Sequence, residues 1–174
     1  MSRDNVTPFR KRRPPPKPVR QGPPLSTHRG KAVAVEACAL LMGVFQALLV
    51  APIVMAWIPG LGGAALVLVQ HSPPPVVISL LSLAGAGCGF FIALSNRQTA
   101  MPWAQTHHEF ALRTIVVGVC GSALASVTGF LGILGVAAVP IRTVTAMWVM
   151  ARACVGLVGA IRRQAMMRPA GWWF

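Results

Sequence analysis

A few charged side chains within apolar sequence are the groups of this 174-residue chain that could do chemistry. Of its three acidic residues, Glu36 lies inside the first apolar run and Glu109 opens a later one. Glu109 and Arg113 are four residues apart, a spacing that favours an ion pair on one helix face. Arg152 lies about nine residues from the end of the last apolar run, roughly 14 Å deep at the rise of an α-helix. A charge at that depth is costly without a partner.

Two interpretations of these charges stay open. In the first, they form a polar cluster inside the membrane that binds an ion, a proton or an anionic headgroup, with the members Glu36, Glu109, Arg113 and Arg152. In the second, which we favour, the Arg152 side chain snorkels to the interface or bonds helix carbonyls, and Glu109 pairs with Arg113.

The sequence gives little support for metal binding or for catalysis. The adjacent His107 and His108 point about 100° apart on a helix and precede the third apolar run, so they suit an interfacial role better than a shared metal. His71 falls in a loop, and the four cysteines form no CxxC pair. The serines of the apolar runs have no intramembrane histidine or aspartate that could activate them. We therefore expect no catalytic, cofactor-binding or metal-binding residues, and no enzyme.

The elements that must position these charges are membrane-spanning helices. Hydrophobic residues make up 55% of the chain and charged residues 11%, too apolar a composition for an ordinary soluble domain. Runs of about 20 apolar residues are long enough to cross a bilayer as helices. The sequence therefore predicts an all-α, integral membrane four-helix bundle over 32–161, with spans at about 32–58, 76–95, 109–134 and 142–161.

The segments between and around these spans are predicted as follows. Residues 1–31 are basic and rich in proline, so we expect a disordered cytoplasmic tail. Leu61–Gln70 is apolar but too short to cross alone, and it either continues the first helix, lies in the interface or re-enters. Val136–Pro140 is expected to form a tight outer turn. Residues 162–174 are expected to form a cytoplasmic interfacial segment.

Charge sets the expected orientation. Nine of the sixteen Lys and Arg residues fall in the first 31 positions. With that tail inside, Arg97 and the basic C-terminal residues are also inside, and Arg142 alone is outside. The positive-inside rule thus predicts that both termini are cytoplasmic. The tail is expected to contact anionic lipid headgroups, and nucleic acid is disfavoured because no nucleic-acid-binding module follows it.

Small residues at helical spacing indicate where the helices pack. In lipid, close backbone approach and van der Waals contact drive helices together. The expected packing positions, within one protomer or between protomers, are Gly85, Gly89, Gly121, Ala125 and Gly129.

Two runs carry a resemblance to a known family. His108–Thr114 opens a span after a short connection, and Trp148–Arg152 is followed by Gly156, a basic end and an aromatic C-terminus. Over residues 35–174 the chain resembles small four-span bacterial inner-membrane proteins, distantly similar to the Tic20-like component of chloroplast protein import. The resemblance implies a four-helix bundle with both ends inside, and it implies no substrate.

The sequence as a whole favours a non-enzymatic protein of the bacterial inner membrane, acting as a scaffold or accessory subunit. Its partner is then a membrane protein or a second copy of the chain. The alternative is a small oligomeric transporter or channel that uses Glu36 and Arg152.

Overall fold

The computed structural model describes residues 27–98, 101–131, 135–167, 169 and 171, which form helices and connecting turns without a strand. The helices are α1 (His28–Trp57), α2 (Gly62–His71), α3 (Pro75–Ser95), α4 (Pro102–Phe130) and α5 (Gly135–Arg162). Within this part of the chain, all but α2 are long and apolar enough to cross a membrane. The predicted all-α four-helix bundle is confirmed, and it supports a multi-pass membrane protein. The predicted disorder of the tail concerns residues that lie almost wholly outside the described ranges.

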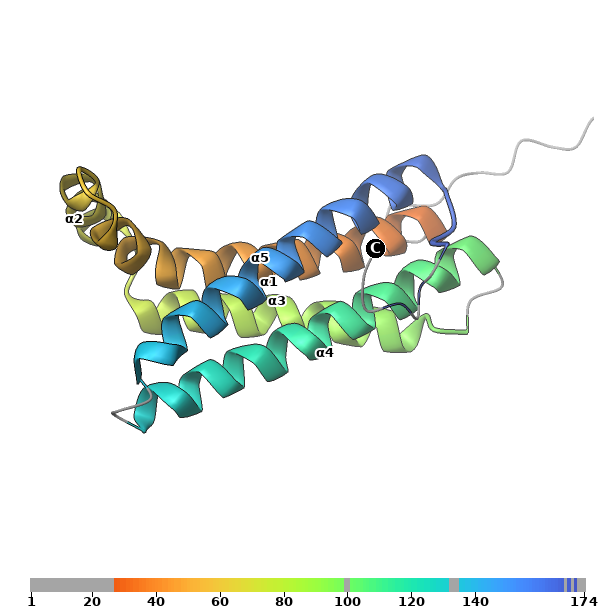
Figure 1. The fold of residues 1–174 in the computed structure, drawn as a ribbon. Helices are drawn as coiled ribbons and strands as arrows, with labels where there is room; N and C mark the ends of the chain where they lie inside the picture. Colours follow the sequence, from red (N-terminus) through yellow and green to blue (C-terminus); the bar gives the residue numbers. More distant parts are fainter. Residues whose placement is uncertain (1–26, 99–100, 132–134, 168, 170, 172–174) are drawn as a thin grey trace, which may run out of the picture.

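The four long helices run up and down in chain order (Figure 1). Both α1 and α4 contact all three other long helices, whereas α3 and α5 contact α1 and α4 but not each other in the described ranges. We call the end where α1 begins and α5 ends the basic end, because Arg29, Lys31, Arg97, Arg162 and Arg163 lie there. The short helix α2 lies at the opposite end.

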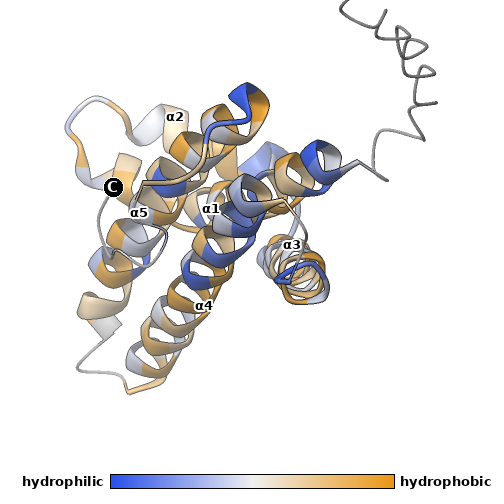
Figure 2. Ribbon diagram, turned by 90° about the vertical axis from the view of Figure 1, so that its right-hand side faces the viewer, coloured by the Kyte–Doolittle hydropathy of each residue, from blue (hydrophilic) through white to orange (hydrophobic). Residues whose placement is uncertain are grey.

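The surface of the bundle is largely apolar. Hydrophobic colour predominates along the helices in Figure 2, and large apolar side chains such as Leu80, Leu83 and Phe91 are more than half exposed. A soluble monomer rarely exposes so much contiguous apolar surface. This surface suits contact with lipid or with another apolar helix.

Local signals at the basic end fix where helices begin. The hydroxyl of Thr27 accepts a hydrogen bond from the amide of Gly30 at 3.0 Å, which caps the start of α1. Lys31 Nζ donates to Asn96 Oδ1 at 2.8 Å and ties the start of α1 to the end of α3. Pro102 occupies the first position of α4, where its missing amide costs nothing.

Two predicted boundaries were wrong, and one of the alternatives left open for Leu61–Gln70 is excluded. The third span begins at Pro102 rather than Glu109, because its first two turns are polar and hydropathy alone misses them. The predicted outer turn Val136–Pro140 is helical and belongs to α5, since a membrane helix tolerates an internal proline such as Pro140. The apolar segment after α1 is a separate helix, α2, so it does not continue the first span.

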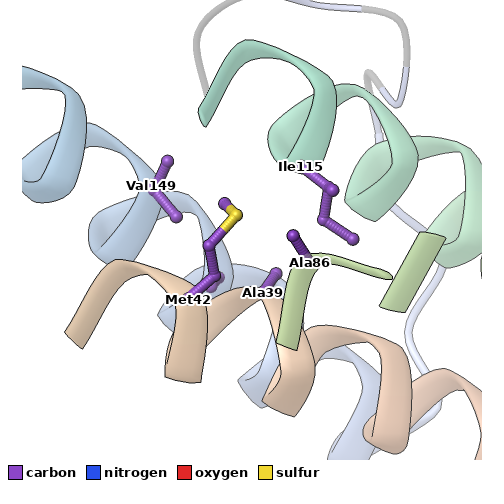
Figure 3. Packing of buried hydrophobic residues seen from close by; sticks show 6 residues of the cluster. Ala39, Met42, Ala86, Ile115 and Val149 are labelled. Atoms are coloured by element: carbon purple, nitrogen blue, oxygen red, sulfur yellow. The ribbon is translucent and has the colours of Figure 1, made fainter. Parts of the chain in front are cut away.

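An apolar layer crosses the middle of the bundle and receives side chains from every long helix (Figure 3). Met42 of α1 lies at its centre and is 1% exposed. The remaining buried members of the layer are Ala39, Ala86, Ile115, Val149 and Ala153.

The small residues that were expected at helix seams lie between helices of the one chain. A Cβ on Gly85 would lie 3.3 Å from the carbonyl oxygen of Cys38 in α1, and one on Gly89 would lie 2.8 Å from Ile115 Cδ1 in α4. A Cβ on Gly121 would overlap Thr145 of α5, and Ala125 is buried. Gly129 is less tightly covered, because a Cβ there would lie 3.7 Å from Ala138 Cβ.

Candidate functional site

A buried acid and a buried imidazole meet near the basic end of the bundle. His107 Nδ1 of α4 lies 3.3 Å from Glu36 Oε1 of α1, and both side chains are fully buried. His107 Nε2 lies 2.8 Å from the carbonyl oxygen of Gln164, which can only accept, so Nε2 carries a proton. The contact with Glu36 requires one further proton. That proton belongs either to Glu36, which gives a neutral pair, or to His107, which gives an ion pair.

Two glycines of α5 make room for this pair. A Cβ on Gly156 would overlap the Glu36 carboxyl, and a Cβ on Gly159 would lie 3.1 Å from His107 Cε1. The two glycines are three residues apart and therefore share a helix face. The Glu36 carboxyl lies directly against the α5 backbone at Gly156.

Arg152 of α5 forms the second part of the site. Its Nε donates to Thr114 Oγ1 at 3.1 Å, and its Nη1 donates to the carbonyl oxygen of Gly171 at 3.0 Å. The guanidinium also lies over the rings of Phe110 and Trp148, at 4.0 and 4.9 Å, in cation–π geometry. Arg152 is 1% exposed and attracts Glu36 electrostatically. We call Glu36, His107, Thr114 and Arg152 the inner polar cluster.

The C-terminal segment after α5 closes this cluster. Gln164 and Gly171 each supply a carbonyl oxygen, to His107 and Arg152 respectively. The amide of Met166 donates to Thr106 Oγ1 at 3.0 Å and fixes the same segment to the N-terminal part of α4. The buried polar groups of His107 and Arg152 are thus satisfied partly by backbone groups of the chain's own C-terminal segment.

The structure separates into two pairs the four residues that the first interpretation placed in one polar cluster. Glu36 and Arg152 belong to the inner polar cluster, whereas Glu109 and Arg113 pair with each other at 3.4 Å on a partly exposed face. The second hypothesis is right about the Glu109–Arg113 pair. Of its two alternatives for Arg152, snorkelling is wrong, because the guanidinium is buried beside an aromatic ring. Carbonyl bonding is right in part, since Arg152 donates to the carbonyl oxygen of Gly171, which lies after α5 and not within a helix.

The two histidines were predicted to precede the third helix, and this was wrong, whereas their interfacial role stays a prediction. Both His107 and His108 lie within α4 and are buried. The signal that could have found them is the spacing of Ala104, His107, His108 and Ala111, which share one helix face after the favourable start at Pro102. Thr114 lies one turn further along and was also missed.

The described residues contain no group of three or more His, Cys, Asp or Glu side chains that could hold a metal ion. The site's own chemistry is that of a proton shared between Glu36 and His107 beside a buried guanidinium. Such a cluster can join helices, hold a proton or neutralise an anion.

Searches of protein-family models, curated proteins and solved structures found no match to this chain. The resemblance to Tic20-like proteins stays a prediction.

Proposed function

We propose that this chain is a non-enzymatic scaffold or accessory subunit of a complex in a bacterial inner membrane, with both termini in the cytoplasm. One observation carries the proposal: Glu36 and Arg152 are sealed inside the bundle and engaged by the chain's own groups. In a solute pathway, charged groups in the membrane usually face a water-filled cavity. Here they join α1, α4, α5 and the C-terminal segment into one unit.

The surfaces left for a partner differ in chemistry. The long helices present apolar side chains along their length, which suits a neighbouring membrane helix. The basic end presents Arg162 and Arg163 as exposed groups, which suit anionic headgroups or an acidic cytoplasmic partner.

Affinity purification of the full chain in mild detergent, followed by mass spectrometry, tests the proposal. We expect a membrane protein in constant ratio to the chain, and a several-fold lower recovery with an Arg162→Gln, Arg163→Gln double variant if the partner contacts the basic end. Gly87→Ala is the matched control, because a Cβ at Gly87 meets nothing within 4 Å. Recovery of the chain alone, at the background of an unrelated membrane protein, would contradict the proposal.

A small oligomeric transporter is the second candidate, favoured by the shared proton of Glu36 and His107. Glu36 Oε2 has no hydrogen-bond partner within the described structure, so this oxygen of the carboxyl is open to a proton. Proton flux into liposomes containing the purified chain tests this function. Flux that Glu36→Gln abolishes and Glu109→Gln spares would support transport over the scaffold.

A further inference from the structure

A second polar region lies on the far side of the apolar layer from the inner polar cluster. It lines a cavity of about 240 Å³ between the long helices. Its polar lining residues are Gln46, Ser79, Ser82, Ser122, Ser126 and Arg142. Met42 borders the cavity and belongs to the apolar layer, so this layer closes it toward the basic end.

Arg142 provides the positive charge of this cavity. Its Nη2 donates to Ser126 Oγ at 2.8 Å. The described part of the chain contains two carboxylates, and each is engaged elsewhere, Glu36 with His107 and Glu109 with Arg113. The charge of Arg142 thus faces the cavity without a carboxylate of the described chain to balance it.

The serine hydroxyls and the carbonyl oxygen of Gln46 offer acceptors to a ligand. Ser82 Oγ donates its proton to the carbonyl of Met42, and Ser122 Oγ donates to that of Gly118, so their lone pairs remain for a ligand. Gln46 is 4% exposed, lines the cavity, and its Oε1 has no hydrogen-bond partner in the described structure. A buried oxygen without a donor is costly, and a ligand that donates to it removes that cost.

The surroundings of the cavity are apolar, and they indicate what kind of molecule fits it. Leu83, one of its lining residues, is 63% exposed on the lipid-facing surface. Arg142 and Ser126 also line a neighbouring cavity of about 380 Å³, whose other residues are apolar except for backbone groups. A molecule with a polar group at Arg142 and an apolar portion beside it fits both spaces.

We propose that this cavity binds an anionic group that carries a hydrogen-bond donor close by, with the anion on Arg142 and the donor on Gln46 and the serine oxygens. Phospholipid headgroups with an ammonium or hydroxyl group have this chemistry, and so does free glycerol phosphate. The proposal is independent of whether the chain is a scaffold or a transporter.

Lipid titration of the delipidated full chain, followed by native mass spectrometry, tests the lipid source. Phosphatidylglycerol and phosphatidylethanolamine are expected to bind more tightly than phosphatidylcholine, whose headgroup has no N–H or O–H donor. Arg142→Gln is expected to weaken binding about tenfold, the loss of one charge-assisted hydrogen bond. Arg113→Gln, which changes a partly exposed arginine paired with Glu109 on α4, is the matched control and is expected to change binding less than about twofold.

Calorimetric titration with glycerol 3-phosphate tests the free source with the same variants. Loss of binding with Arg142→Gln in either titration supports the proposal and identifies the source. Equal binding of Arg142→Gln and Arg113→Gln in both titrations overturns it. If Arg142→Gln does not fold, Gln46→Met decides, because it removes the acceptor for the donor of the ligand at similar side-chain volume. Binding unchanged in Gln46→Met would then overturn the proposal.

Discussion

At the scale of single residues, the inner polar cluster solves a problem that one buried charge creates. An arginine in the membrane interior needs partners, and Arg152 has a hydroxyl, a carbonyl and two aromatic rings. Its attraction to Glu36 makes the two charges interdependent.

We expect this interdependence to appear in a double-mutant cycle. Glu36→Gln and Arg152→Gln each leave the other charge less compensated, so the double variant should lose less stability than the sum of the singles. The expected coupling is about 0.5–3 kcal/mol, measured by unfolding in mixed detergent micelles. Losses that add to within about 0.5 kcal/mol would show that the two charges act separately.

Gly156 permits the position of Glu36, so Gly156→Ala should be destabilising. Its new Cβ would overlap the Glu36 carboxyl, and overpacking of this kind costs about 1–3 kcal/mol. The melting temperature in detergent measures the effect. Gly87→Ala, which meets nothing within 4 Å, should leave it unchanged or raise it, since alanine is the better helix former.

At the scale of elements, hydropathy predicted the four spans but not all of their ends. The long apolar runs of α1 and α3 lie close to the predicted ranges because their boundaries coincide with changes in composition. The polar first turns of α4 were read as a loop, because hydropathy hides a buried face that only the helical spacing of small residues and histidines indicates. The partners of His107 in α1 and the C-terminal segment are brought to it by tertiary packing.

The candidate site, like the spans, was only partly predictable from the sequence. Glu36 and Arg152 were identified because a charge inside an apolar run is visible in sequence. Their actual partners were not, because Thr114 and the carbonyl of Gly171 are brought to Arg152 only by tertiary packing.

The α4–α5 seam depends on Gly121. Gly121→Ala would place a Cβ 2.5 Å from Thr145 Oγ1, so we expect a loss of about 1–3 kcal/mol and a lower melting temperature. Adding Thr145→Ala removes the two nearest atoms and should restore part of the loss. A double variant no more stable than Gly121→Ala would mean that the seam is not closed by this contact.

At the scale of the whole molecule, the charge distribution predicts orientation. The basic end carries Arg29, Lys31, Arg97, Arg162 and Arg163, and the opposite half carries Arg142. Removal of residues 1–26 should therefore leave the orientation unchanged by the positive-inside rule. Thiol labelling in intact cells measures it, with single cysteines placed at Gln98 and Gly63 in a chain without its native cysteines.

We expect the cysteine at position 63 to react with a membrane-impermeant reagent and that at position 98 to react only after the cells are opened. The same pattern is expected for the full and the shortened chain. Reaction at position 98 in intact cells would place the basic end outside.

The separation of Glu36 from His107 by 71 positions along the chain also has a consequence for biogenesis. The ribosome adds about 5–20 residues per second, so α1 exists for several seconds before the imidazole that binds its carboxyl is made. During that interval the newly made helix must hold Glu36 as a neutral acid or keep it near the headgroups. Insertion of α1 and its packing against the other helices are therefore separate steps for this chain. The carboxyl of Glu36 reaches its final position only after α5 and the segment that follows it have been made.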